Sequence, residues 1–197
     1  MRKLMYSMMV SLDGFIEGPH GEIDWVIVEE ELHRFANQQA RESGVFLYGR
    51  RLYEAMRYWQ TAEADSSLPD YAIEFARIWR EKPKVVFSHT LDKVEGNSRL
   101  AAGDLADEIQ RLKAEPGQDI TIGGAHLAAA AVRLGLVDEI QPIVHPVVLG
   151  SGTRFLPDVP ARMNLRLVES RTFGTGVVYL RYVNEPLAAT NPQEVVT

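Results

Sequence analysis

Hydrophobic residues occur along this chain in short apolar runs that alternate with longer segments of helical periodicity. Apolar runs rich in Val, Ile, Leu and Met are typical of strands, whereas apolar residues repeating every three or four positions predict amphipathic helices. Segments rich in Gly, Pro, Asp and Ser, at 14–24, 60–70 and 150–153, are typical of loops. The predicted strands cover 2–10, 45–48, 84–87, 119–122, 138–149, 164–173 and 176–183. The predicted helices cover 29–43, 50–58, 104–114 and 125–135, and a further helix has its apolar stripe at 71–79 and stops before Pro83.

The order of these elements predicts the fold class. Strands and helices alternate through most of the chain, and the last two strands flank Gly174-Thr175-Gly176, which predicts a hairpin. This order predicts an α/β fold with a mostly parallel central sheet, a C-terminal antiparallel hairpin and helices on both faces. Because no repeat or linker divides the chain, we expect a single domain over 1–185, followed by a disordered tail over 186–197 that is rich in Pro, Ala, Asn and Thr.

Composition and charge exclude several classes of function. The absence of cysteine rules out disulfides, a thiolate nucleophile and cysteine-based metal sites. A formal net charge of −6 disfavours a protein that binds nucleic acid through its phosphates. The apolar N-terminal run is interrupted by Ser7, Ser11 and Asp13, and no stretch has the ~20 apolar residues of a membrane span. We therefore expect a cytoplasmic protein with neither nucleic acid nor membrane as a partner.

Two strand–glycine–helix junctions are the strongest candidates for ligand binding. Gly49 precedes a predicted helix that starts with Arg50-Arg51, and Gly123-Gly124 precedes an alanine-rich helix. Helix N-termini offer free N–H groups to phosphate oxygens, and glycine lets a phosphate approach the backbone. The forked donors of arginine suit a phosphate monoester such as the 2′-phosphate of NADPH. Together with the hydroxyls of Ser88-His89-Thr90, these junctions predict a dinucleotide site along the carboxyl edge of the sheet.

Each piece of this site also has a plain structural explanation. A glycine at a strand–helix turn commonly serves backbone geometry, and adjacent arginines are commonly a solvated helix face. Other familiar motifs are absent: the chain has no G-x-G-x-x-G, no P-loop and no G-x-S-x-G. Its five histidines lack zinc-ligand spacing, so we expect no metal site.

The motifs, taken in order, resemble those of the dihydrofolate reductase superfamily. The nearest branch is the C-terminal reductase domain of the bifunctional riboflavin-biosynthesis deaminase/reductase, with its stand-alone relatives. The resemblance spans nearly the whole chain and implies a dihydrofolate-reductase-like three-layer fold. The motifs that carry it are SLDGFIEG (11–18), YGRRLYEAM (48–56), VVFSHTL (85–91), ITIGGAHL (120–127), LVDEIQPIVHPVVLGSGTRFLP (136–157) and LVESRTFGTGVVYLRY (167–182).

The resemblance implies NADPH as cofactor. An arginine after Gly49 would bind the 2′-phosphate, the helix start after Gly123 would cradle the pyrophosphate, and the 12–16 loop would lie over the nicotinamide. Leu52 replaces the hydroxyl usual in the family after the Gly-Arg turn, which removes one phosphate contact. The 149–152 loop would close the same cleft or contribute to a homodimer. The implied cofactor-binding residues are Leu12, Gly14, Phe15, Ile16, Gly49, Arg50, Arg51, Ser88, His89, Gly123, Gly124, Ala125, His126 and Leu127.

The implied reaction is hydride transfer to a small heterocyclic substrate of pyrimidine type, as in 5-amino-6-(5-phosphoribosylamino)uracil reduction. A dihydrofolate or pteridine reductase is the second choice, and a non-catalytic nucleotide-binding module is an alternative of another class. Asp13 and Glu31 are the candidate catalytic groups, although Asp before Gly also forms turns, and glutamates at a helix start also complement its dipole. The candidate substrate-binding residues are Trp25, Glu31, Phe35 and Gly152.

Overall fold

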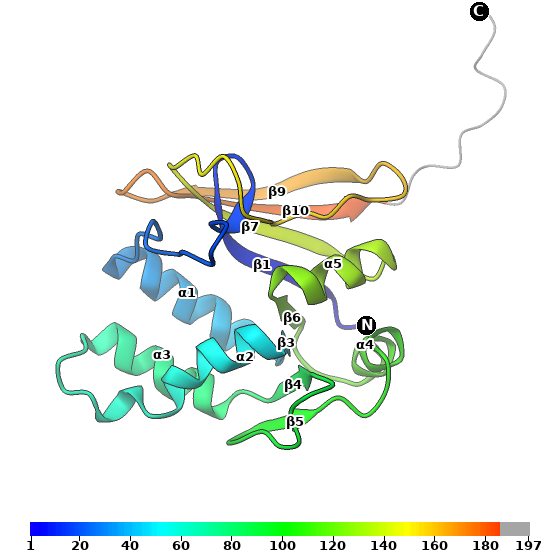
Figure 1. The fold of residues 1–197 in the computed structure, drawn as a ribbon, viewed down its shortest axis with the longest axis horizontal. Coiled ribbons are helices and arrows are strands. Elements are labelled where there is room, and N and C mark those ends of the chain that lie inside the picture. The colour runs from blue at the N-terminus through cyan, green and yellow to red at the C-terminus, as the bar shows by residue number, and fades with distance from the viewer. Residues whose placement is uncertain (186–197) are drawn as a thin grey trace, which may run out of the picture.

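The centre of the molecule is an eight-stranded sheet, shown in Figure 1. The computed structural model describes residues 1–185, and the strands of this sheet are β1 (Leu4–Ser11), β3 (Val45–Gly49), β4 (Lys84–Phe87), β5 (Ser98–Leu100), β6 (Ile120–Gly123), β7 (Glu139–His145), β9 (Asn164–Thr172) and β10 (Val178–Glu185). They lie in the order β5-β4-β3-β6-β1-β7-β10-β9. Neighbours from β5 to β7 run parallel, whereas β10 is antiparallel to β7 and β9 is antiparallel to β10.

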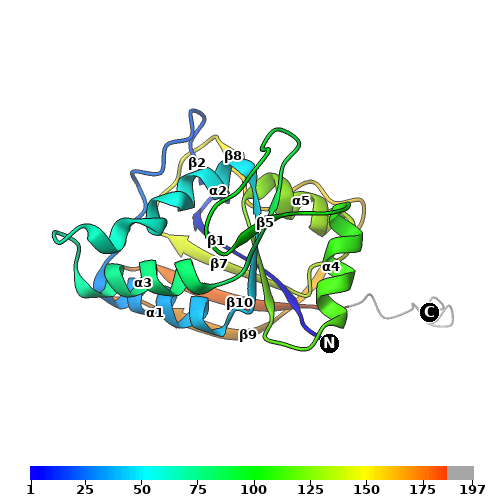
Figure 2. The ribbon, with the colours of Figure 1, turned by 90° about the horizontal axis from the view of Figure 1, so that it is seen from below.

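Helices cover both faces of this sheet. They are α1 (Glu30–Glu42), α2 (Arg50–Met56), α3 (Asp70–Glu81), α4 (Leu105–Ala114) and α5 (Ala125–Arg133), with short 3-10 helices η1 (Arg57–Gln60) and η2 (Ala62–Ala64). Figure 2 shows α1, α2 and α3 on one side of the sheet and α4 and α5 on the other. The predicted fold class, a mostly parallel sheet with a C-terminal antiparallel hairpin and helices on both faces, is therefore confirmed.

The sheet is buried from both sides because its central strands consist of continuous apolar runs. On one face, Leu47 and Ile122 belong to a core cluster that includes Ile109 of α4. On the other face, Val86 packs in a cluster with Trp79 of α3. Each face thus has its own core, and the helices are fixed by the apolar stripes that their sequences predict.

Several elements differ from the sequence prediction. A second sheet of two short strands, β2 (Phe15–Glu17) and β8 (Thr153–Arg154), lies in two predicted loops. Its strands are too short for a recognisable pattern, and their pairing joins distant parts of the chain. The strand predicted over 138–149 ends at His145, where the chain turns and the Val147 N–H donates to the His145 carbonyl at 2.8 Å. The helix predicted over 50–58 changes to a 3-10 helix after Met56.

Residues 186–197, predicted as a disordered tail, lie outside the described residues, and the division into one domain and a tail stays a prediction. Within residues 1–185, none of the helices has both the length and the apolar character needed to cross a membrane.

A buried carboxylate connects three segments at one end of the sheet. Glu139 of β7 has no exposed surface. Its oxygens accept hydrogen bonds from Lys3 Nζ at 2.8 Å, Arg181 Nε at 2.7 Å and Gln141 Nε2 at 3.1 Å. Burial alone would raise the pKa of Glu139, but these hydrogen bonds outweigh it and lower the pKa to about 2. The carboxylate therefore ties β10 and the start of β1 to β7.

We expect Glu139→Gln to lower the free energy of unfolding at pH 7 by about 1–3 kcal/mol, because it removes the buried charge that accepts hydrogen bonds from Lys3 and Arg181, two cations that are themselves partly exposed. The folded-state pKa lies below the ordinary value of 4.5, so the carboxylate stabilises the fold fully above pH 4.5. That contribution is lost as the pH falls from 4.5 towards 2. Urea denaturation of both proteins at pH 7 and pH 3 measures the difference, which should be smaller at pH 3.

The matched control is Glu185→Gln, which removes the exposed ion pair between Glu185 and Arg166 in the C-terminal hairpin. An exposed pair contributes about 0–1 kcal/mol, so this variant should stay close to the parent protein. Equal losses for the two variants would contradict the role assigned to Glu139.

Candidate functional site

The carboxyl ends of five parallel strands form one edge of the sheet, in the order β4-β3-β6-β1-β7. Strand register places Gly49 opposite Phe87 and Tyr48 opposite Gly123. The segments that follow β4, β3 and β6 therefore start level with one another. The structure brings the Ser88-His89 turn, the Gly49-Arg50-Arg51 turn and the Gly123–Leu127 segment to one place, as the sequence predicts for parallel strands.

Two helices begin side by side at this edge. A Cβ on Gly49 would lie 3.8 Å from Leu127 Cβ, and a Cβ on Gly123 would lie 2.7 Å from Leu52 Cδ2. Gly124, at φ +86°, is the N-cap of α5, and no side chain caps that helix. The N–H groups of Ala125, His126 and Leu127 thus have no side-chain cap, as an anion site requires, whereas the Gly124 N–H donates to Met8 Sδ at 3.4 Å.

The two arginines after Gly49 turn to different partners. Arg50 Nη1 donates to Thr90 Oγ1 at 3.4 Å, in the turn that Ser88 Oγ stabilises by accepting the Thr90 N–H at 3.1 Å. Arg51 Nη2 instead lies 3.4 Å from Glu17 Oε1. Arg50 is therefore directed to the turn after β4, whereas Arg51 is directed to β2.

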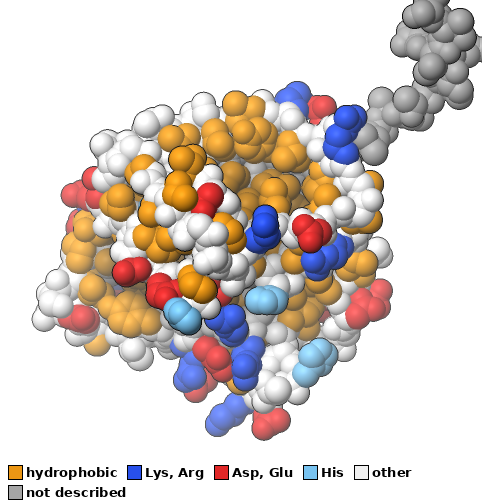
Figure 3. Space-filling view, turned by 45° about the horizontal axis from the view of Figure 1, so that its top comes forward, with side chains coloured by type: hydrophobic (Ala, Val, Ile, Leu, Met, Phe, Trp, Pro, Cys, Tyr) orange, Lys and Arg blue, Asp and Glu red, His pale blue; other side chains and the backbone are white. Residues whose placement is uncertain are grey.

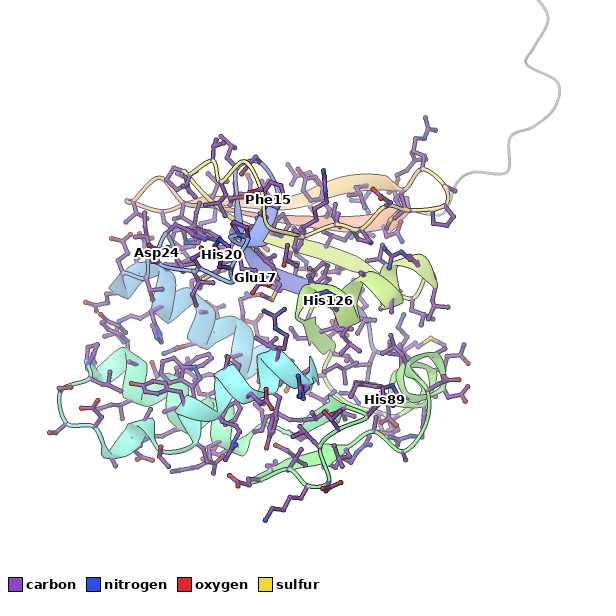
Figure 4. The ribbon with its side chains drawn as sticks, viewed as in Figure 1. Phe15, Glu17, His20, Asp24, His89 and His126 are labelled. Carbon is purple, nitrogen blue, oxygen red and sulfur yellow. The ribbon has the colours of Figure 1, made fainter. Side chains whose placement is uncertain are left out.

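Figure 4 shows how the labelled side chains surround this edge. Glu17 and His20 come from the segment after β1, across from His126 at the start of α5, and His89 lies further along the same side. Figure 3 shows histidines on this surface beside basic and acidic side chains. Basic, acidic and histidine side chains are thus mixed on this surface.

Asp13 joins the loops after β1 and β7. Its carboxylate accepts hydrogen bonds from Ser11 Oγ at 2.7 Å, the Leu149 N–H at 3.1 Å and the Gly150 N–H at 2.7 Å. The Ser11 hydroxyl and these backbone donors hold the pKa of Asp13 below its ordinary value. An ionised carboxylate that accepts three hydrogen bonds positions the 149–152 loop and has no proton to donate at neutral pH.

Glu31 and Phe35 lie where α1 packs against the C-terminal hairpin. Glu31 Oε1 accepts a hydrogen bond from Arg171 Nη2 at 3.0 Å. The Arg171 guanidinium lies 5.2 Å from the centre of the Phe35 ring and 4.9 Å from that of Phe173. Phe35 is buried in a cluster with Phe173 and Tyr179. Both predicted substrate residues thus make structural contacts.

Trp25 and Gly152 have other surroundings. The Trp25 indole N–H donates to the Glu22 carbonyl at 3.2 Å, and the ring meets the His145 ring edge-on at 5.4 Å. Gly152 has φ +144°, and a Cβ there would overlap the Glu17 carbonyl oxygen. Gly152 is therefore required for the close approach of β8 to β2.

An apolar cavity between α1, η1 and α3 was not anticipated from the sequence. Its volume is about 200 Å³. No pattern in the sequence indicates it, because His33 lies in an apolar helix stripe that is typical of the core. The lining residues are Met9, Val28, Leu32, His33, Ala36, Met56, Trp59 and Phe75.

Several known proteins resemble this chain in sequence or in fold. The RibD C-terminal domain family matches residues 2–179. YyaP of Bacillus subtilis (strain 168) is 37% identical over 184 residues, which are 92% of this chain and 94% of YyaP. A protein from Shewanella sp. PV-4, assigned provisionally to riboflavin biosynthesis, has a crystal structure that matches with a TM-score of 0.70 at 20% identity, over 93% of this chain and 99% of that chain.

A longer protein shares the fold. The Thermotoga maritima diaminohydroxyphosphoribosylaminopyrimidine deaminase/5-amino-6-(5-phosphoribosylamino)uracil reductase matches with a TM-score of 0.65 at 14% identity. The match covers 93% of this chain and 56% of that chain. The three-layer fold that the sequence motifs imply is thereby confirmed.

We expect Gly152→Ala to lower the melting temperature more than Gly150→Ala does. Both glycines have positive φ, so both substitutions incur about 1–2 kcal/mol of backbone strain. Only the Cβ at position 152 meets backbone, the Glu17 carbonyl, whereas position 150 has no atom within 4 Å. Calorimetry of both variants measures the difference, and amide exchange at Phe15–Glu17 should rise only in Gly152→Ala. Equal melting temperatures would contradict the crowding at residue 152.

Proposed function

This chain belongs to the RibD C-terminal domain family, and we propose that it is an NADPH-dependent oxidoreductase whose substrate is a small heterocycle of the pyrimidine or pterin type. The observation that carries this proposal is the meeting of two glycine junctions at one sheet edge, beside Arg50. An uncapped helix start and an arginine directed to a hydroxyl-rich turn suit the two phosphate positions of such a dinucleotide.

The residues at this edge fit the cofactor. Gly124 has φ +86°, a backbone conformation that favours glycine, and it leaves the start of α5 without a side chain. The first turn of α5, from Gly124 through Leu127, would hold the pyrophosphate, and Gly123 allows Leu52 to pack beside that turn. NADPH, when bound, supplies the hydride. The protein's part is to orient both reactants and to exclude water.

Arg50 is the better candidate for the 2′-phosphate. Within residues 1–185, no carboxylate oxygen lies within 4 Å of Arg50, whereas Arg51 is paired with Glu17. Arg50 also reaches the turn whose hydroxyls, Ser88 and Thr90, add donors for a phosphate monoester. His89 extends from the same turn. Arg51 would then contribute by holding β2 beside the cofactor.

The loop over the nicotinamide is fixed at several points. The Phe15 N–H donates to Ser11 Oγ at 2.9 Å, and the Phe155 N–H donates to the Gly14 carbonyl at 2.8 Å. Leu12 remains 67% exposed and is available to contact a bound ring together with Ile16. A loop held in this way forms a wall that excludes water from the reacting atoms. Since Asp13 is committed to its backbone partners, we assign proton delivery to solvent.

The alternatives have less support. A dihydrofolate-type reductase requires a carboxylate at the pterin ring, and Glu31, the candidate for it, is bound by Arg171. The name of the Thermotoga protein, which includes a ribosylaminouracil reductase, favours the pyrimidine type as first choice. A non-catalytic nucleotide-binding module would bind NADPH without oxidising it. The homodimer and the cytoplasmic location remain predictions.

We expect Arg50→Ala to weaken NADPH binding by about 2 kcal/mol, which is roughly thirtyfold, because it removes charge-assisted hydrogen bonds to the 2′-phosphate. NADH lacks this phosphate, so its affinity should change little. Isothermal titration calorimetry with both nucleotides measures the two affinities. Arg51→Ala should affect NADPH less than Arg50→Ala does.

Arg133→Ala, near the other end of α5, is the matched control and should leave both affinities unchanged. Failure of the parent protein to bind either nucleotide at millimolar concentration would overturn the proposal. Binding without NADPH oxidation across pterin and pyrimidine substrates would instead favour the non-catalytic module.

A further inference from the structure

His33 is the one residue lining the apolar cavity whose side chain has a nitrogen or oxygen that can accept a hydrogen bond, and Trp59 adds an indole N–H donor. It is 8% exposed, and the rings of Trp59, Tyr71 and Phe75 surround it with centroid distances of 6.0, 5.0 and 5.7 Å. No Lys, Arg, Asp or Glu lines the cavity. The cavity therefore suits an uncharged ring, and His33 is the one nitrogen or oxygen acceptor among its lining side chains.

Hydrogen bonds around Asn37 determine which nitrogen of His33 carries the proton. Asn37 has no exposed surface, and its Nδ2 donates to the Tyr71 carbonyl at 2.9 Å and to Glu74 Oε2 at 2.7 Å. Both partners only accept hydrogen bonds, so the amide cannot be flipped. Asn37 Oδ1, 3.1 Å from His33 Nδ1, must then accept the Nδ1 proton.

The neutral imidazole consequently has a lone pair on Nε2. Among the described residues, no side chain or backbone group forms a hydrogen bond with this nitrogen. Trp79 Nε1 and Tyr179 OH also lack a partner, but those two atoms are fully enclosed, whereas Nε2 is not. Burial lowers the pKa of His33, which keeps the ring neutral near pH 7.

We propose that His33 Nε2 is the hydrogen-bond acceptor that selects the substrate ring, so that the cavity takes a neutral aromatic heterocycle presenting an N–H. This inference rests on the proposed function, for which the cavity would be the substrate end of the site. Helix α2 connects the two ends: it begins at the Gly49 junction, and Met56 at its end lines the cavity. At 1.5 Å per residue, its seven residues span about 10 Å.

Size and charge restrict the ligand further. An apolar cavity of about 150 Å³ holds benzene, so the 200 Å³ here admits one small ring system. A sugar phosphate would meet only hydrocarbon, aromatic and thioether walls, which give no compensation for its lost hydration. Any phosphorylated part of the substrate is therefore expected to remain outside the cavity.

The test compares two isomeric probes, 3-methylindole, which has an N–H, and 1-methylindole, which has none. Binding is measured by calorimetry without nucleotide, so the outcome does not depend on the cofactor site. Labelled methionine methyl groups locate the probe by NMR: Met9 and Met56 should shift, whereas Met5 and Met163, outside the cavity lining, should not. We expect 3-methylindole to bind about threefold to tenfold more tightly, the usual net effect of one hydrogen bond.

His33→Phe keeps an aromatic ring and removes the acceptor, so it should abolish the preference between the isomers. His20→Phe alters a histidine outside the cavity lining and should retain the preference. If His33→Phe does not fold, the ¹⁵N resonance of Nε2 in the parent protein decides instead, because only 3-methylindole should move it.

Equal affinity of the parent protein for the two isomers would overturn the inference. Absence of shifts at Met9 and Met56 would overturn it as well. Either result leaves the nucleotide titrations unaffected, so failure here is distinguishable from failure of the proposed function.

Discussion

The first turns of α2 and α5 meet at Gly123, where a side chain would have to displace Leu52. Leu52 occupies the space that a Cβ on Gly123 would need, 2.7 Å from that position. This contact sets the distance between two helix starts on neighbouring strands. The candidate phosphate positions, the direction of Arg50 and the path of α2 towards the apolar cavity all depend on that distance. The leucine that removes an expected hydroxyl is thus also the residue that packs the junction.

Strands and turns that follow from local sequence patterns could be predicted from the sequence. Contacts between distant segments of the chain could not. Apolar runs and glycine punctuation predict β3, β6 and the junctions at Gly49 and Gly123, and parallel strands necessarily bring their carboxyl ends to one edge. The pairing of β2 with β8 involves five residues at widely separated positions, which carry no periodic signal. For the same reason, the sequence indicated one phosphate-binding role for Arg50 and Arg51 and did not show that the two side chains have different partners. Only the fold shows that Glu17 lies beside one of them.

Side chains assigned to chemistry from the sequence divide into two groups in the structure. Those on the glycine junctions meet at the sheet edge, where backbone donors and arginine suit an anion. Glu31 and Phe35 instead form the contact between α1 and the hairpin, because Arg171 lies over both Phe35 and Phe173. Conversely, His33 sits in an apolar helix stripe that pattern alone assigns to the core. Its polar partner, Asn37, is recognisable as such only once α3 is packed against α1.

The hydrogen bonds that the Asp13 carboxylate accepts have a consequence for acid tolerance. Asp13 joins the loops after β1 and β7 through one carboxylate and the backbone N–H groups of Leu149 and Gly150, and those amide donors do not titrate. Because the pKa of Asp13 lies below its ordinary value of 3.8, the carboxylate keeps its charge through mildly acidic conditions. A histidine in the same place would change charge close to neutrality. The hydrogen bonds between the two loops are therefore kept through pH changes at which a histidine in the place of Asp13 would gain or lose its charge.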